Sequence, residues 1–320
     1  MKRRHFLEAS VAGAIATITS RHTWAAEVSR VVDGFPPGGM VDVATRVIAE
    51  ALSANLGTTF IVENKPGAGG RIGVGVVKNA APDGRTWLVT PSAIITVYPN
   101  IYPDLGYDAF TLAPVTTLTN IYKVLAVAYD HPAKTLDEFI AWTKQRPASA
   151  KIGTPGAGTG PHFVGIMLAK QSGAKVAFVH YPGDPPVWQN VIGGIIDAGV
   201  ATLVTSAPQH RAQKLRVLAI TAPKRSPVIP DVPTFNELGH DIRADEWLGL
   251  FAPPKTPATM IAKLNQAVRD VLGTARVRQP FENLGLEPTG SSVEDLEAIV
   301  KKDFEHWREV VKVYNFKIDN

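Results

Sequence analysis

Two glycine-rich loops hold the residues of this chain that are best suited to binding chemistry. The first, 35–42, reads Phe-Pro-Pro-Gly-Gly-Met-Val-Asp and stands between the apolar run 30–32 and an amphipathic stretch. This order predicts a strand, a tight turn and a helix. The first backbone N–H groups of a helix have no partner inside it, and the helix dipole makes them attractive to anions. We therefore expect loop 35–42 to bind an anionic group.

The second loop, 153–162, reads Gly-Thr-Pro-Gly-Ala-Gly-Thr-Gly-Pro-His and also opens a predicted helix. Its N–H groups are suited to hold the same anion from the opposite side, as a pincer. The run 156–161 starts like a dinucleotide-binding fingerprint, but Pro161 stands where the third glycine is required. No Gly-Lys-Ser/Thr of a phosphate loop follows either, so we expect no nucleotide.

The composition is that of a globular protein with a substantial core. The chain has 320 residues, enough for about two domains, with 45% apolar and 19% charged residues. It has no cysteine, which excludes disulfides, thiolate metal sites and cysteine nucleophiles. Its eight histidines show no metal-ligand spacing, so we expect neither a metal nor a cofactor.

Residues 1–25 are predicted to be an export signal that is removed. Basic residues 2–4 precede the mild apolar stretch 11–18, and small residues surround the expected cleavage site after Ala25. The run Arg3-Arg4-His5-Phe6-Leu7 favours the twin-arginine route, and a periplasmic location follows. The signal carries four basic residues and one acid, so its removal lowers the formal charge from +4 to +1. No basic stripe remains, and we expect no nucleic-acid partner.

Short apolar runs alternate with helical patterns along the mature chain. Strands are predicted at 59–62, 86–89, 124–127, 176–179 and 215–220. A capping box at 135–138, a Thr256-Pro257 start and a Ser-Ser-Val-Glu start at 291–294 predict three helices, the last reaching about Tyr314. This alternation predicts an α/β fold with largely parallel sheets.

Two apolar strands, near 122–128 and 247–253, are placed to cross between two lobes. We expect residues 27–125 together with 246–320 to form the first lobe, and residues 126–245 to form the second. The space between two such lobes is where small ligands usually bind.

Several short motifs, in this order and spacing, resemble the substrate-binding proteins of tripartite tricarboxylate transporters, also called the Bug family. They cover essentially the whole mature chain: Phe-Pro-Pro-Gly-Gly at 35–39 with Asp42, 62–70 with Ile72-Gly73, 80–84, Gly158-Thr159 with His162, 225–227, 230–234, 249–253 and Leu284-Gly285. The resemblance implies a two-lobed type II periplasmic-binding-protein fold that binds a small organic acid between its lobes, without catalysis. It also implies membrane subunits of such a transporter as partners, and we expect a monomer. In this family backbone groups, hydroxyls and bridging waters hold the carboxylate.

The expected ligand-binding residues come from both loops and from neighbouring turns. They are Phe35, Pro36, Gly38, Gly39, Ser92, Thr154, Gly158, Thr159, Gly160, His162, Tyr181, Gly183 and Thr202. Asp42 is expected to brace its loop, because its charge would repel a carboxylate. His162 either touches the ligand or braces the second loop, and bracing is favoured. The glycine cluster 67–73 is expected to be a structural turn.

Three departures from the family pattern bear on specificity. Asp33-Gly34 replaces an apolar-Pro pair, and Asp33 either faces the pocket or pairs with a surface base. Ile94 makes the wall at 92–94 more apolar, and Ala201-Thr202 replaces a common Asp-Asn pair. A less polar wall leaves the polar groups of a highly functionalised ligand unpaired. We therefore expect a mono- or dicarboxylate with an apolar or aromatic body, ranked above amino acids and citrate-like hydroxyacids.

The sequence also bears on two other function classes. An enzyme is not expected, because the chain has no Gly-x-Ser-x-Gly elbow and no His-Glu-x-x-His motif. A receptor that presents its ligand to a periplasmic sensor would share the fold and the pocket, so the sequence leaves both uptake and signalling open.

Overall fold

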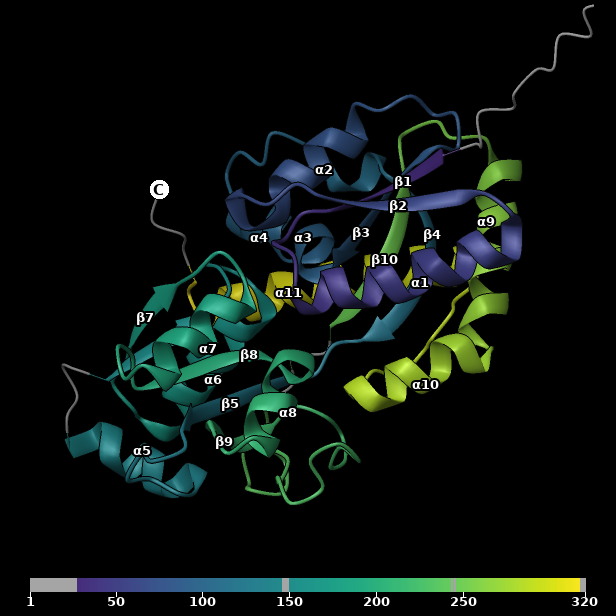
Figure 1. The fold of residues 1–320 in the computed structure, drawn as a ribbon. Helices are drawn as coiled ribbons and strands as arrows, with labels where there is room; N and C mark the ends of the chain where they lie inside the picture. The colour runs from purple at the N-terminus through teal and green to yellow at the C-terminus, as the bar shows by residue number, and fades with distance from the viewer. Residues whose placement is uncertain (1–27, 146–149, 243, 245, 317–320) are drawn as a thin grey trace, which may run out of the picture.

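The computed structural model describes residues 28–145, 150–242, 244 and 246–316; the predicted export signal at 1–25 lies outside this range. The described residues form two five-stranded sheets, one in each of two lobes (Figure 1). The strand orders are β2-β1-β3-β10-β4 and β7-β6-β8-β5-β9. Each sheet is covered by its own helices and so forms a separate lobe.

The first lobe contains the N-terminal strands and one strand from late in the chain. Its strands are β1 (Val28–Asp33), β2 (Thr59–Asn64), β3 (Thr86–Pro91), β4 (Ala113–Asn120) and β10 (Trp247–Ala252). Its helices are α1 (Met40–Leu56), α2 (Arg71–Lys78), α3 (Ser92–Thr96), α4 (Tyr98–Ile101), α9 (Ala258–Leu272) and α10 (Ala275–Leu284), with short 3₁₀ turns at Ala68–Gly70 and Ala109–Thr111. Buried side chains of α1, β3, β10 and α9 share one apolar core.

The second lobe is built from one continuous stretch of chain. Its strands are β5 (Lys123–Ala128), β6 (Lys151–Thr154), β7 (Ala177–His180), β8 (Ala198–Thr202) and β9 (Leu215–Ile220). Its helices are α5 (Leu136–Gln145), α6 (Gly160–Ser172), α7 (Asp184–Ile192) and α8 (Leu203–Arg211). The α/β class that the sequence predicts is therefore confirmed.

The sheets are mixed, not largely parallel as expected. Strands β1, β2 and β3 pair in parallel, as do β6, β7 and β8. In contrast, β10 is antiparallel to both β3 and β4, and β5 is antiparallel to both β8 and β9. These two strands follow directly on the crossings between lobes, so they enter their sheets from the junction and run against their neighbours.

The chain crosses between the lobes at two points close in space. One crossing is Ile121-Tyr122, between β4 and β5, and the other is at Glu246, just before β10. The backbone N–H of Ile121 donates to the carbonyl of Glu246 at 2.8 Å, which ties the crossings together. The expected boundary at residue 125 falls inside β5, whose whole length pairs in the second sheet.

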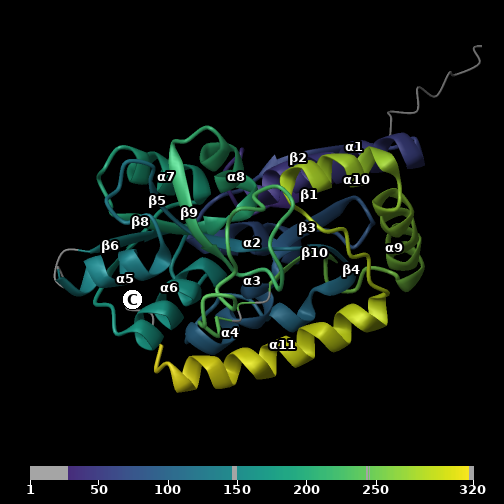
Figure 2. The ribbon, with the colours of Figure 1, turned by 90° about the horizontal axis from the view of Figure 1, so that it is seen from below.

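The C-terminal helix α11 (Val293–Val313) runs along both lobes (Figure 2). Its start packs on the first lobe through β4 and α3. Near its end, the ring of Trp307 lies 5.0 Å from that of Phe163 on α6, between ring centres. Beyond the helix, the ring centre of Phe316 lies 4.9 Å from that of Phe163. This segment was expected to belong to the first lobe alone, but it also stabilises the second.

Glycines in the cluster 67–73 are required by close packing. Gly67, Gly69 and Gly70 have positive φ angles of 135°, 64° and 95°. A Cβ atom on Gly73 would lie 2.8 Å from the Cα of Gly34, so the start of α2 packs directly on the backbone after β1. The cluster is therefore a structural turn, as the sequence predicts.

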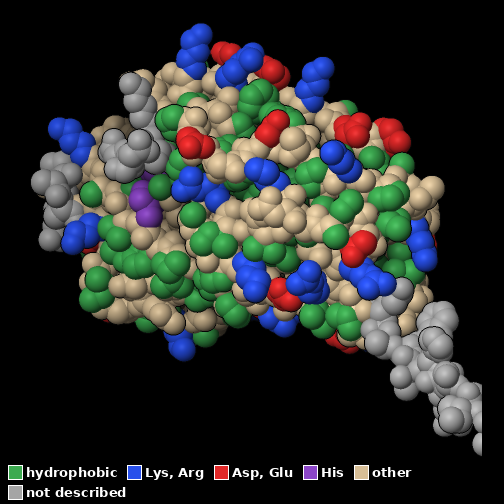
Figure 3. Space-filling view, turned by 90° about the horizontal axis from the view of Figure 1, so that it is seen from above, with side chains coloured by type: hydrophobic (Ala, Val, Ile, Leu, Met, Phe, Trp, Pro, Cys, Tyr) green, Lys and Arg blue, Asp and Glu red, His purple; other side chains and the backbone are tan. Residues whose placement is uncertain are grey.

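Basic and acidic side chains are interspersed on the face shown in Figure 3. Among the described residues, no helix is both long and apolar enough to cross a membrane. Within the same residues, no cluster of three or more histidine or acidic side chains has the arrangement to hold a metal ion.

Candidate functional site

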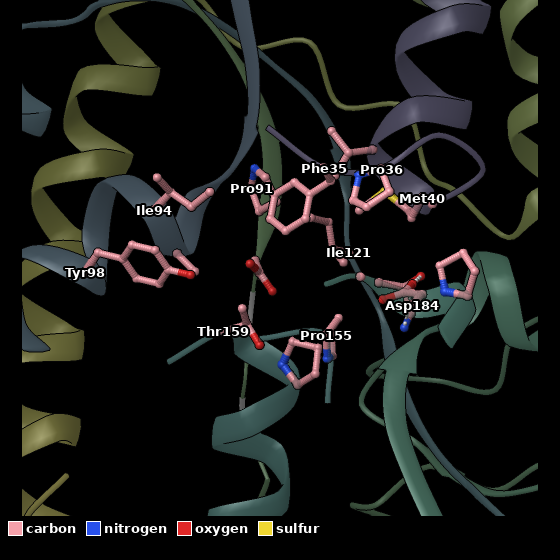
Figure 4. A pocket seen from close by; sticks show the side chains of 18 residues that line it. Phe35, Pro36, Met40, Pro91, Ile94, Tyr98, Ile121, Pro155, Thr159 and Asp184 are labelled. Carbon is pink, nitrogen blue, oxygen red and sulfur yellow. Dashed lines mark hydrogen bonds between the residues drawn. The ribbon is translucent and has the colours of Figure 1, made fainter. Parts of the chain in front are cut away.

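One cleft lies where the two lobes meet, and Figure 4 shows Phe35 and Pro36 of the first lobe facing Thr159 and Asp184 of the second. The space between its walls is about 570 Å³, part of it open to solvent. The walls are formed by Phe35, Pro36, Gly39, Met40, Val41, Pro91, Ala93, Ile94, Tyr98, Ile121, Pro155, Thr159, Pro161, Gly183, Asp184, Pro185, Thr202 and Glu246. Most of these side chains are apolar.

Four helices of nine residues or more begin at this cleft: α1, α6, α7 and α8. Their N-cap residues, Gly39, Thr159, Gly183 and Thr202, all line it. None of these four residues caps its helix with a side-chain hydrogen bond. Because the first N–H groups of a helix lack partners and carry partial positive charge, the cleft offers backbone donors to an anion from both lobes.

Asp42 holds the first loop in shape. Its carboxylate accepts the backbone N–H of Gly38 at 3.0 Å, the side-chain amide of Asn64 at 3.0 Å and the guanidinium of Arg46 at 2.8 Å. Burial opposes ionisation of Asp42, but hydrogen bonds from Arg46, Gly38 and Asn64 together keep its pKa below the usual value. The geometry is that of a brace, and Asp42 does not line the cleft.

Asp33 is a buried brace of the same loop. Its Oδ1 accepts the backbone N–H of Phe35 at 2.8 Å, and its Oδ2 accepts the amide of Asn64 at 3.2 Å. The side chain is fully buried and does not line the cleft, so neither role considered from the sequence is correct. Burial raises the pKa of Asp33 to about 8, because the charged form loses its hydration.

His162 braces the second loop. Its Nδ1 accepts the backbone N–H of Gly158 at 3.1 Å, so the ring lies behind the loop, outside the cleft wall. The Thr159 hydroxyl donates to the carbonyl of Gly156 at 2.8 Å and closes the turn further. Burial, with a smaller contribution from the neighbouring His180, lowers the pKa of His162 to about 3. The ring is therefore neutral in the folded protein at ordinary pH.

A buried ion pair lies at the junction of the lobes. The Lys123 ammonium group is 2.8 Å from Oε2 of Glu246 and donates to the carbonyls of Ile121 at 3.0 Å and Ala244 at 2.7 Å. Lys123 is fully buried, and Glu246 is 8% exposed where it borders the cleft. A Cβ atom on Gly160 would lie 2.2 Å from Oε2 of Glu246, so only glycine lets this carboxylate approach the start of α6.

A second acid, Asp184, borders the cleft at the start of α7. Its Oδ2 accepts the Thr205 hydroxyl at 2.9 Å, the backbone N–H of Thr202 at 3.3 Å and the Thr202 hydroxyl. Burial raises its pKa and the Thr202 and Thr205 hydrogen bonds oppose this shift, while the charge of Glu246 adds to it. The donors of Thr202 and Thr205 thus converge on one oxygen of this carboxylate.

The structure places six of the predicted residues in the cleft wall and seven outside it. The six are Phe35, Pro36, Gly39, Thr159, Gly183 and Thr202. The seven are Gly38, Ser92, Thr154, Gly158, Gly160, His162 and Tyr181. Several of the seven shape the wall from behind it.

Three of these seven have polar groups that are engaged elsewhere or exposed. Gly38 is exposed on the outer side of its loop, with φ at +80°. Ser92 is buried, and its hydroxyl accepts the backbone N–H of Trp247 at 3.4 Å. The Thr154 hydroxyl is 2.7 Å from Nδ1 of His180. Their polar groups are therefore used inside the protein or face solvent.

Sequence reasoning missed the two acids and much of the apolar wall. Asp184 directly follows Gly183, an expected ligand-binding residue, and Glu246 directly precedes the apolar strand expected at 247–253. Nothing in the sequence distinguishes these two from the other acidic residues. The apolar residues Met40, Ile94 and Ile121 lie on elements whose inward faces only the fold reveals.

Comparison with known proteins decides the family. The family described as tripartite tricarboxylate transporter family receptor matches residues 44–316. The chain belongs to this family. The match confirms the resemblance, and it includes the motifs at 62–70 and 249–253.

Three solved structures show the same fold in other proteins. The periplasmic binding protein BugD is 28% identical, with a TM-score of 0.86 over 91% of this chain and 98% of its own. MatC from Rhodopseudomonas palustris, with bound malate, is 30% identical, with a TM-score of 0.83 over 90% of this chain and 100% of its own. Rpa4515 from R. palustris, with adipate, is 27% identical, with a TM-score of 0.87 over 91% of this chain and 98% of its own. The two-lobed periplasmic-binding-protein fold is thereby confirmed.

Proposed function

We propose that this receptor captures a small organic acid, a mono- or dicarboxylate with an aliphatic or aromatic body, in the cleft between its lobes. The observation that carries the proposal is the convergence of four uncapped helix N-termini on a cleft with apolar walls. Backbone N–H groups then hold the carboxylate, directly or through bridging water, and Phe35, Met40 and Ile94 contact the body of the ligand.

The solved relatives support this class of ligand. One contains malate and another adipate, two small dicarboxylates that differ in length and in a hydroxyl group. We propose that the protein acts outside the cytoplasm without catalysis, and that it delivers its ligand to the membrane subunits of a tripartite tricarboxylate transporter. The family match supports this role.

A thermal-shift panel of organic acids on residues 26–320 tests the ligand class. A ligand at about 100 times its dissociation constant stabilises the folded state by about 2.7 kcal/mol, which raises the thermal midpoint measurably. Stabilisation by carboxylates, and not by their amides, is the expected result. Stabilisation by sugars or amines alone would refute the proposal.

A pair of variants at one position tests the role of the helix N-terminus. Met40 is the first residue of α1, and Gly39 before it is extended, with φ −78° and ψ 170°, so proline fits at position 40. Met40→Pro removes one backbone N–H donor, whereas the control Met40→Ala removes the same side chain and keeps the donor. We expect Met40→Pro to bind at least tenfold more weakly than Met40→Ala. Equal affinities would mean that the carboxylate does not use this N-terminus.

Delivery is tested separately, by uptake of the radiolabelled acid into cells with and without the gene. Loss of uptake that is restored by the intact gene supports transport. Unchanged uptake, together with tight binding, would instead favour the receptor for a periplasmic sensor.

A further inference from the structure

One carboxylate oxygen of Asp184 accepts several hydrogen bonds, and the other accepts none from the described residues. The Trp188 indole N–H can only donate, and it lies 2.9 Å from the Thr205 hydroxyl oxygen, so Thr205 directs its own proton to Oδ2 of Asp184. Together with two donors from Thr202, this fixes Oδ2 as an acceptor. Among the described residues, nothing donates to Oδ1. The side chain is only 6% exposed, and this exposure is toward the cleft.

Glu246 presents a second free oxygen. Its Oε2 takes the ammonium group of Lys123, whereas no described residue donates to Oε1. Two backbone carbonyls also hold Lys123, so the junction between the lobes fixes the position of Glu246. Some side-chain atoms of the described structure are unpaired and also sealed from solvent, but Oδ1 of Asp184 and Oε1 of Glu246 are not among them. Both oxygens are therefore reachable from the cleft.

The cleft wall contains no lysine, arginine or histidine to pair with these oxygens. A ligand made only of carboxylates and apolar carbon would place more negative charge beside two unpaired acceptors. A buried acceptor that loses water and gains no donor disfavours binding. A ligand that brings its own donor removes this cost.

We propose that Asp184 and Glu246 are specificity-determining residues that accept a hydrogen bond from an ammonium or hydroxyl group on the bound acid. The inference rests on the proposed function, because it assumes a carboxylate in the cleft.

The two lobes divide the tasks of recognition. In α1 no proline interrupts the first turn, so Met40, Val41 and Asp42 each keep a backbone N–H. In contrast, α6 and α7 carry Pro161 and Pro185 near their starts and have fewer donors. In α8 the N–H of Leu203, its first residue, already donates to the carbonyl of Tyr122 at 2.9 Å. The carboxylate therefore binds at the first lobe, and the donor group of the same ligand meets the acids across the cleft. One ligand then bridges both lobes.

This inference reverses the ranking of ligands expected from sequence. In the sequence, the replacement of a common Asp-Asn pair by Ala201-Thr202 predicted a less polar wall. The structure shows that Thr202 instead orients Asp184, a carboxylate supplied from α7. Amino acids and hydroxyacids then rank above unsubstituted acids.

Two matched sets of ligands test the proposal by calorimetry on residues 26–320. One set is succinate, malate and aspartate, and the other is 3-phenylpropionate, phenyllactate and phenylalanine; within a set only the group on carbon 2 changes. In any set that binds, we expect the hydroxyl or amino member to bind at least tenfold more tightly than the unsubstituted acid. Equal or tighter binding of the unsubstituted acid overturns the inference and leaves the proposed function intact. Failure of every acid in the wider panel refutes the proposed function itself.

The variant Asp184→Asn tests the residue directly. Its carbonyl oxygen can still accept from Thr202 and Thr205, and its amide then turns a donor toward the cleft. We expect the preference within a set to fall at least tenfold. The matched control is Asp137→Asn, an exposed acid in the first turn of α5.

Glu246→Gln repeats the test from the second acid, with thermal midpoints showing that each variant is folded. An unchanged preference in both folded variants overturns the proposal. A preference lost in both variants and kept in Asp137→Asn supports it.

Discussion

Replacing Asp33 by asparagine should change how the stability of the protein depends on pH. In the folded protein Asp33 keeps its proton up to about pH 8, whereas the unfolded chain loses it near 3.8. The folded pKa is the higher one, so the stability from this group is complete below pH 3.8 and is lost as pH rises through 8. One pKa unit corresponds to about 1.4 kcal/mol, so the free energy of unfolding falls by about 2 kcal/mol between about pH 6.5 and 9.

This pH window separates Asp33 from His162. The pKa of His162 is about 3 in the folded protein and 6.5 without its surroundings, so its contribution is lost only as pH falls below 6.5. Asp184, whose pKa burial also raises, declines in the same direction, but it is present in the wild type and in Asp33→Asn alike, so the difference between the two proteins belongs to Asp33. Asparagine at position 33 keeps an acceptor for the N–H of Phe35 and cannot ionise.

Urea unfolding, followed by circular dichroism in steps from about pH 6.5 to 9, measures the effect. We expect Asp33→Asn to lose about 2 kcal/mol less than the wild type over this range. The matched control is Asp83→Asn, because Asp83 likewise accepts the N–H of the residue two positions on, Arg85 at 3.0 Å, but is exposed. The free energy of unfolding of Asp83→Asn should decline with pH as that of the wild type does. An equal decline in Asp33→Asn would refute the claim that burial keeps Asp33 protonated.

Three further variants test other parts of the structure. Gly160→Ala places a Cβ atom 2.2 Å from Oε2 of Glu246, so the thermal stability should fall by about 1–3 kcal/mol; an unchanged midpoint would show that the junction relaxes freely. His162→Phe removes a ring that must stay neutral in the folded protein. The free energy of unfolding of the variant minus that of the wild type, measured by urea unfolding, should therefore be about 3 kcal/mol more favourable at about pH 4 than at about pH 7. A constant difference would contradict the lowered pKa. Gly183→Ala places a Cβ atom on a residue with φ of +117°, 3.3 Å from the ring of Pro36. Calorimetry should show about tenfold weaker ligand binding, and wild-type affinity would exclude a role for this contact.

Local signals in the sequence predicted the elements that carry them strongly. The apolar run 215–220 is strand β9, residue for residue. The C-terminal helix begins at Val293 with Ser292 as its cap, both inside the expected start motif 291–294, and it ends one residue before the expected end at Tyr314. At α9 the signal was misread by one position, because Pro257 is itself the N-cap and the Thr256 hydroxyl donates to the carbonyl of Pro253.

Strands with weak apolar patterns escaped prediction. Strand β4 (Ala113–Asn120) is rich in threonine, and β8 (Ala198–Thr202) consists of small residues, yet both are buried in their sheets. Their pairing partners, β10 and β5, come from distant parts of the chain. No local pattern encodes that pairing, so the antiparallel half of each sheet was missed.

The candidate site shows the same division. The helix N-caps Gly39, Thr159 and Gly183 were predicted, because strand, glycine turn and helix follow one another in sequence. The acidic pair Asp184 and Glu246 was not, because 62 positions separate the two residues and only the crossing of the chain brings both to one cleft.

The order of strands also sets the order in which the molecule can be completed. In the first sheet β10 lies between β3 and β4, so that sheet stays open until residues 247–252 have been made. The sheet of the second lobe needs only residues 123–220, one uninterrupted stretch. During synthesis the second lobe can therefore form its sheet while the first lobe still exposes the edges of β3 and β4, which are prone to pair with other chains. The first lobe, whose synthesis begins first, is therefore the last to complete its sheet.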